Sequence, residues 1–109
     1  MANPWTGEVA LIIDGDRHVL KLTLGALAEL EDSLGADSLV ALVERFESGA
    51  FSTRDVLALI VAGLRGGGWQ GRAGDLVSAE ISGGPVEAAR AAGRLLARAF
   101  AVPDEGEGR

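Results

Sequence analysis

The chain has 109 residues, a length that suits one domain and leaves no room for two. Hydrophobic residues make up 48% of it, enough for a core, and the absence of cysteine excludes disulfides, thiolate catalysis and Cys-ligated metals. The formal net charge of −6 argues against a nucleic-acid partner, since binding phosphates needs clustered Lys and Arg. The first half is acidic and the second mildly basic. That split fits a charged docking partner or, as we favour, two solvated faces.

The N-terminus and the apolar runs bear on localisation. Residues 1–7 show no basic start followed by an apolar run, so nothing indicates secretion. The longest apolar runs are broken by Asp, Arg or Gly, and none reaches the ~18 residues that a membrane helix needs. We therefore expect a soluble, cytoplasmic protein with no membrane partner.

The chain opens with the pattern of a β-hairpin over about residues 8–23. Residues 9–13 are apolar and rich in β-branched side chains, and Asp14-Gly15 is a strong turn signal because glycine tolerates positive φ. Residues 17–23 return with alternating apolar and polar side chains. Because the first strand is apolar on both sides, we expect its second face to be partly covered or to pair with another chain.

The remainder, about residues 24–101, has the pattern of four to five helices separated by glycines. Helical spacing of apolar residues and capping signals predict these segments: 24–34 with Thr23 as N-cap and Gly35 as stop, 38–48 ended by Gly49, a third from the Ser52-Thr53-Arg54-Asp55 capping box to Gly66-Gly67-Gly68, 72–81 with Leu76, Val77 and Ile81 facing inward, and 86–101 after Pro85. The third helix is apolar over most of its circumference, which predicts a central position.

The predicted fold class is α+β, with an N-terminal β-hairpin packed on a small bundle of four to five α-helices. One globular domain is expected over residues 1–102. The polar, Gly-rich tail over residues 103–109 is expected to be disordered.

Few residues invite a catalytic interpretation, and each has a plainer structural one. The lone His18 lies in a strand without triad or zinc partners. Asp14 and Asp16 flank the hairpin turn but lack the further ligands and the late Glu of an EF-hand loop. The acids within 29–32 share the solvated side of a helix, whereas a glycosidase needs carboxylates opposed across a cleft. We expect no enzyme, and predict no catalytic, cofactor-binding or metal-binding residue.

The segment from Gly63 to Trp69 is glycine-rich. It follows a helix and lacks the Lys and Ser/Thr of a phosphate-binding loop, so nucleotide binding is not expected. Gly63, inside the third helix, suggests close packing or fraying. The large amphipathic ring of Trp69 serves either as a core plug or as an interaction anchor, and both alternatives remain open.

The last helix is the stronger interaction candidate. Small residues lie in the middle of a narrow apolar seam made of Val86, Ala89, Gly93, Leu96 and Phe100. Beside it, four residues apart, Arg90, Arg94 and Arg98 form a basic stripe. The helix can pack within the core and dock a partner if different faces are used. Trp69 and the three arginines are our predicted partner-binding residues.

Several short segments occur in order between Asn3 and Phe100. They are Gly7-Glu8-Val9, Asp14-Gly15, Leu22-Thr23-Leu24-Gly25-Ala26-Leu27-Ala28-Glu29-Leu30-Glu31, Gly35, Phe51-Ser52-Thr53-Arg54-Asp55-Val56, Ala62-Gly63-Leu64-Arg65-Gly66-Gly67-Gly68 and Leu95-Leu96. Their order and spacing, over about nine tenths of the chain, resemble the tail assembly chaperone family of gene transfer agents and related siphophages, which is also described as phage tail tube protein.

The resemblance implies a protein that binds the tape measure protein, shields its apolar helical segments, brings in tail tube protein and then leaves. It implies no catalytic residue and no cofactor. An acidic body would keep a sticky partner in solution, and grooves between helices would accept amphipathic partner helices. The alternative is a tail structural protein, a tube or connector subunit retained in the particle. A tube subunit should oligomerise through strand edges, and only one hairpin is predicted.

Overall fold

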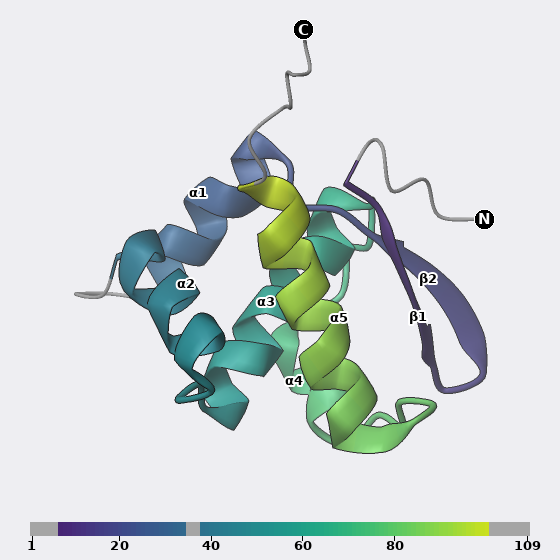
Figure 1. Ribbon diagram of the computed structural model, residues 1–109. Helices are drawn as coiled ribbons and strands as arrows, with labels where there is room; N and C mark the ends of the chain where they lie inside the picture. The colour runs from purple at the N-terminus through teal and green to yellow at the C-terminus, as the bar shows by residue number, and fades with distance from the viewer. Residues whose placement is uncertain (1–6, 35–37, 101–109) are drawn as a thin grey trace, which may run out of the picture.

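The computed structural model describes residues 7–34 and 38–100, which form a two-stranded antiparallel hairpin followed by five helices (Figure 1). In chain order the elements are β1 (Val9–Ile13), β2 (Asp16–Leu20), α1 (Leu24–Ser33), α2 (Leu39–Ser48), α3 (Thr53–Gly66), α4 (Ala73–Val77) and α5 (Gly84–Ala99). The predicted α+β class is therefore confirmed. The tail over residues 103–109, predicted to be disordered, and the predicted stop at Gly35 lie outside the described residues.

The hairpin turns where the sequence predicts it. Asp14 and Gly15 have φ of 51° and 84°, and a type I′ turn requires positive φ at both of these positions. The register that follows places Ile13 opposite Asp16. It turns alternate side chains of β1 into the core, namely Val9, Leu11 and Ile13. On its other face Ala10 is half-buried and Ile12 is exposed, so the expected partial cover of that face is confirmed.

Helix α3 is central, as its apolar circumference predicts. It packs against α1, α4, α5 and β2. Large side chains from most elements are fully buried around it: Val9, Leu20, Leu30, Leu42, Leu59, Ile60, Leu64 and Leu95. Burial of apolar area on this scale is the main stabilising contribution to a domain of this size.

The last turn of α3 lies so close to the end of β2 that their backbones are in contact. A Cβ at Gly63 would lie 2.8 Å from the side chain of Leu95 and 3.0 Å from that of Leu20. A Cβ at Gly66 would overlap the carbonyl oxygen of Lys21, and the Lys21 amide donates to the carbonyl of Gly63 over 2.9 Å. Of the two alternatives for Gly63, close packing is the one observed.

The predicted helix starts are confirmed by capping hydrogen bonds. Thr23 accepts from the amide of Ala26, and Ser38 from that of Ala41, each over 3.1 Å. Pro85 lies in the first turn of α5. Gly49 ends α2 in the left-handed region, at φ 79°. These signals act within four residues, which is why they can be read from the sequence alone.

The short helix predicted over 72–81 is wrong in its second half. Helix α4 ends at Val77, whose side chain is 76% exposed rather than facing inward. The chain then runs extended, and Ile81 forms an antiparallel bridge with Ile13. The amide of Ser82 donates to the carbonyl of Ile12 over 3.0 Å. This segment, residues 79–82, gains from β1 the backbone hydrogen bonds that a longer helix would have supplied internally.

The apolar seam predicted on α5 is divided between core and surface: Leu96 in it is buried, whereas its two ends are exposed. Val86 and Phe100 are 64% and 45% exposed. The buried face instead consists mostly of alanine: Ala88, Ala91, Ala92, Leu95 and Leu96. Small alanine side chains let α5 approach α3 closely, so the alanine-rich face of α5 is the face that points into the core.

A partly buried ion pair joins α2 to the start of α3. Arg45 donates through Nε and Nη2 to the two carboxylate oxygens of Asp55, each over 2.9 Å. Asp55 also accepts from the Ser52 amide, and the Ser52 hydroxyl accepts from the Asp55 amide, completing the predicted capping box. The hydrogen bonds from Arg45 lower the pKa of Asp55 against the opposing effect of burial, and the bond from Ser52 lowers it further.

Replacing Gly66 with alanine tests the contact between α3 and β2. The added methyl group overlaps a backbone oxygen that cannot move without shifting β2, so G66A should lower the free energy of unfolding by ~2 kcal/mol. Urea denaturation measures the change. The control is G25A in α1, where an added Cβ would make only an ordinary contact with Thr23 Oγ1 at 4.0 Å and the variant should gain up to about 1 kcal/mol. Equal behaviour of the two variants would contradict the contact.

Asp55→Asn tests the ion pair through pH. At pH 7 the variant should lose ~2 kcal/mol of unfolding free energy. Because the folded-state pKa of Asp55 lies below its unfolded value, the contribution is complete above the unfolded pKa of about 3.9 and disappears as pH falls through the folded pKa. The difference between wild type and variant should therefore stay constant from about pH 7 to pH 5 and shrink below about pH 4.

The control for that titration is Asp75→Asn. Asp75 accepts from the Arg72 amide over 2.9 Å at the exposed start of α4, so it shares the capping role at an exposed position. It should cost under about 1 kcal/mol. A difference for Asp55→Asn that persists undiminished at pH 2 would show that its charge does not stabilise the fold.

Candidate functional site

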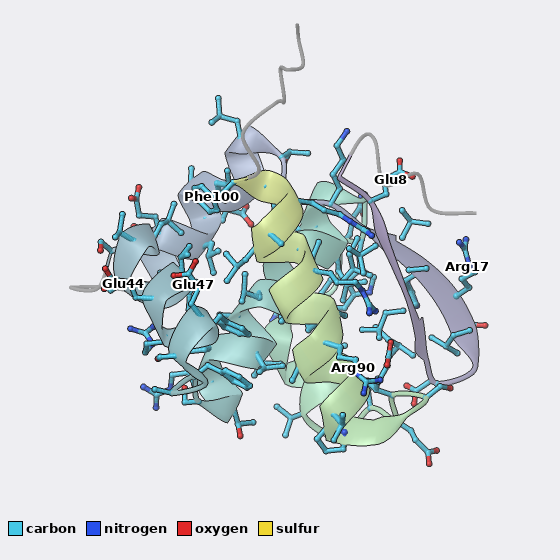
Figure 2. All side chains as sticks on the ribbon, in the orientation of Figure 1. Glu8, Arg17, Glu44, Glu47, Arg90 and Phe100 are labelled. Carbon is cyan, nitrogen blue, oxygen red and sulfur yellow. The ribbon has the colours of Figure 1, made fainter. Side chains whose placement is uncertain are left out.

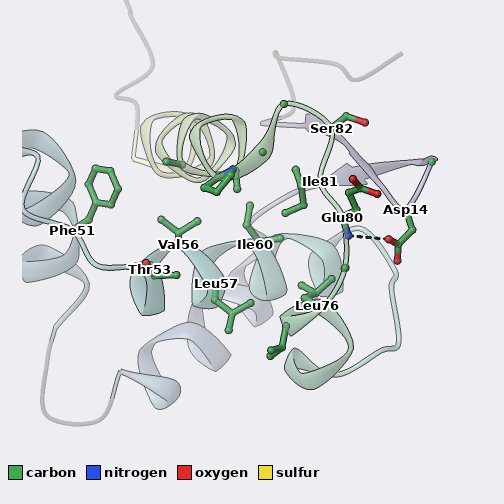
Figure 3. Close-up of a pocket in the computed structure, with 18 residues that line it drawn as sticks. Asp14, Phe51, Thr53, Val56, Leu57, Ile60, Leu76, Glu80, Ile81 and Ser82 are labelled. Atoms are coloured by element: carbon green, nitrogen blue, oxygen red, sulfur yellow. Dashed lines mark hydrogen bonds between the residues drawn. The ribbon is translucent and has the colours of Figure 1, made fainter.

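An apolar groove of about 1080 Å³ opens between α3, α4, the 79–82 segment and the start of α5 (Figure 3). Val56 and Ile60 point from α3 toward α5, and Leu76 closes the floor beneath the 79–82 segment. Ala88 and Ala89 of α5 form the opposite side. These two alanine side chains are small, so they fill little of the space at the start of α5.

The outer wall of the groove is held by the tip of the hairpin. The amide of Glu80 donates to Asp14 Oδ1 over 2.8 Å (Figure 3), and the amide of Asp14 donates to the carbonyl of Glu80 over 2.7 Å. These reciprocal bonds join positions 66 residues apart in the sequence. The wall therefore depends on the hairpin being folded.

Two phenylalanines stack at the far end of the groove. The ring of Phe51 lines it and lies parallel to that of Phe46 in α2, with centroids 4.5 Å apart and planes 8° apart. Phe46 in turn lies 3.9 Å from where a Cβ of Gly93 would be on α5. Residues of α2 thus position one end of the groove without lining it.

The charges around the groove are of one sign. Among the described residues that line it, the charged ones are Asp14 and Glu80, both acidic, and both lie at the outer wall. Thr53 and Ser82 add polar side chains at the edges. Chemically, this site can bind an apolar surface and favours a cationic neighbour at one side.

Trp69 lies away from the groove. Its half-buried side chain packs against the core, and a Cβ at Gly71 would overlap its indole ring. The amide of Trp69 donates to the carbonyl of Leu64 over 2.9 Å, which holds the residue close to the end of α3. The structure thus places Trp69 as a core plug, one of the two alternatives, and its role in partner binding stays a prediction.

The three arginines of α5 lie on the side of the helix nearest β1, outside the groove. Arg94 donates to Glu87 over 3.1 Å, and Arg90 is 3.7 Å from the same carboxylate. Arg98 donates to the backbone carbonyl of Glu8. The side chain of Arg90, labelled in Figure 2, is 68% exposed, compared with 42% for that of Arg94. The structure does not bring these arginines together with Trp69 in one site.

The residues that line the groove were not predicted as a site. The available signal was the apolar character of α3, which has apolar side chains over most of its circumference. Val56 and Leu57 remain half-buried on that helix. An excess of apolar surface on a helix predicts either a larger core or an open groove, and only the path of residues 79–82 decides between them.

Within residues 7–34 and 38–100, no group of three or more His, Cys, Asp or Glu side chains is placed to hold a metal ion. Among the helices of these residues, none is both long and apolar enough to cross a membrane.

By fold, the chain is a small α+β protein whose helices leave an apolar groove open beside a β-hairpin. The family model described as phage tail tube protein, GTA-gp10, matches residues 6–102, and the chain belongs to this family of gene transfer agent and phage tail proteins. No curated protein and no solved structure matches it. The resemblance seen in the sequence is thereby confirmed at the level of the family.

Asp14→Gly tests whether the hairpin holds the groove wall. Glycine removes the carboxylate acceptor without backbone strain, because it readily adopts the φ of 51° found here. Losing one hydrogen bond of ~1 kcal/mol should speed amide hydrogen exchange at Glu80 about fivefold. Asp14→Asn keeps an oxygen acceptor and serves as the control. If both variants exchange as wild type does, the hairpin does not hold the wall.

Proposed function

We propose that this protein is a tail assembly chaperone that binds the tape measure protein and assists assembly of the tail tube. It acts by binding rather than by catalysis, in the cytoplasm, before the tail is complete. The open apolar groove between α3 and α5 carries the proposal, since a large apolar cleft on a small protein is a typical docking site for another polypeptide. Family membership supplies the setting, a phage-like tail.

Charge supports a chaperone role. A tape measure protein is long and rich in apolar helical segments, so it needs a soluble partner until the tube surrounds it. A formal charge of −6 on 109 residues gives such a complex mutual repulsion in solution. The groove offers the apolar contact, and the acidic body offers solubility.

The second candidate is a tube or connector subunit retained in the particle, which the family description favours. A tube subunit should join its neighbours through strand edges. Here β1 already pairs with the 79–82 segment and receives Arg98 at the Glu8 carbonyl. The first half of β2 carries Asp16, Arg17 and His18, charged or polar residues of the kind that protect an edge strand from pairing. These features favour the chaperone.

Co-expression with the tape measure protein of the same gene cluster tests the proposal. The tape measure protein should be insoluble alone, become soluble with this chain, and co-elute with it in pull-down and size-exclusion chromatography. Purified particles should lack the chain. If no complex forms and the chain is found in purified particles, the protein is a tail structural protein rather than a chaperone.

A further inference from the structure

Resting on the proposed function, we infer that the groove binds an amphipathic α-helix of the partner whose apolar stripe enters the groove and whose Lys or Arg side chains face Asp14 and Glu80. The occupant is thus defined by its secondary structure and by its charge. Three observations support this choice.

The backbone around the groove indicates a helix. An extended segment would need unpaired backbone groups in the wall, yet those of residues 79–82 are largely used. The amides of Ala79, Glu80 and Ser82 donate to Leu76, Asp14 and Ile12, and the carbonyl of Ile81 accepts from Gly84. A segment buried here must satisfy its own N–H and C=O groups, as only a helix does within one segment.

The size of the groove agrees with a helix. Its volume of about 1080 Å³ lies just above the ~300–1,000 Å³ typical of small-molecule pockets. Two long helices, α3 and α5, form its sides. A partner helix placed between them would insert side chains at i, i+3, i+4 and i+7. At the mouth, the 76% exposed Val77 offers an apolar contact that folding leaves uncovered.

The charges select a basic partner over a second copy of this chain. In the described part of the chain, the charged residues that line the groove are Asp14 and Glu80, both acidic. In a symmetric dimer across the groove, each acid would face the same patch of the other copy, and each copy carries a formal charge of −6. Lys or Arg beside the apolar stripe of a partner helix would instead complement these acids.

The probe is the tape measure protein, tested intact and as overlapping peptides of about 25 residues, long enough to span about 37 Å as a helix. Fluorescence anisotropy measures affinity, and circular dichroism measures helix formation on binding. The peptides that bind should carry an apolar stripe flanked by Lys or Arg and should gain helicity in the complex.

Two variants place a cation in the groove, and each has a matched control on α2. V77K and E80K should weaken binding at least tenfold. V40K and E44K change a similarly exposed valine and an exposed acid, both in α2, which lies across the molecule from the hairpin (Figure 1). They should stay within twofold of wild type. All four positions are exposed, so the thermal midpoints should remain close to that of wild type. A Lys→Glu change in the bound peptide should weaken binding to wild type and be rescued by E80K.

Each outcome separates the inference from the proposed function. If intact tape measure protein binds but V77K and E80K bind like wild type, the groove is not the site and the chaperone role stands. If neither intact protein nor peptides bind, the proposed function fails. Binding of acidic or non-helical peptides overturns the inference. So does self-association of the chain that V77K abolishes, because the occupant is then a second copy.

Discussion

The fold depends on how closely the end of α3 approaches β2. Glycine at position 66 lets the helix meet the backbone of Lys21, and glycine at position 63 lets it pack against the side chain of Leu20, at distances that a Cβ would prevent. The amide of Lys21 then donates to the helix, which fixes the hairpin at one angle to the bundle. Because the hairpin is fixed there, its tip reaches Glu80 and holds the outer wall of the groove. The shape of a surface near one end of the molecule thus follows from a contact at the other.

Helix α3 is anchored at both ends and serves two surfaces. Its start is held by the ion pair of Arg45 with Asp55, and its end by β2. Between these anchors, Leu59 and Leu64 are buried in the core. Val56 lines the groove on its α3 side. A side built on a helix fixed in this way is preorganised, so a partner does not have to order it on binding.

The sequence predicts best where the cause is local. The turn at Asp14-Gly15 and the caps at Thr23, Ser38 and Ser52 each depend on residues within a few positions, and all are observed. The four-residue spacing of the arginines correctly places them on one side of α5. Their pairing was harder to foresee, because Arg98 meets the backbone of Glu8, 90 positions away.

Contacts between distant residues explain where the structure departs from the local pattern. Local pattern favoured a helix through Ile81, but pairing with Ile13 supplied competing hydrogen bonds that helical periodicity does not reveal. On α5 the predicted seam began at Val86 and ended at Phe100. Close packing against α3 favours alanine there instead, and leaves Val86 and Phe100 at the surface. The groove results from both effects, so the candidate site could not be predicted from the sequence even though most of the helices could.

The bond between Asp14 and Glu80 also has a consequence for synthesis on the ribosome. Residues emerge N-terminus first, at about 5–20 per second, so the hairpin tip is available several seconds before the wall that it holds. Helix α3 emerges in between, and its apolar surface is then without α4 or α5. The groove therefore forms only when α5 has been translated, and a nascent chain has no finished binding surface to offer. A molecule that uses the groove can therefore bind only a chain whose α5 has already been synthesised.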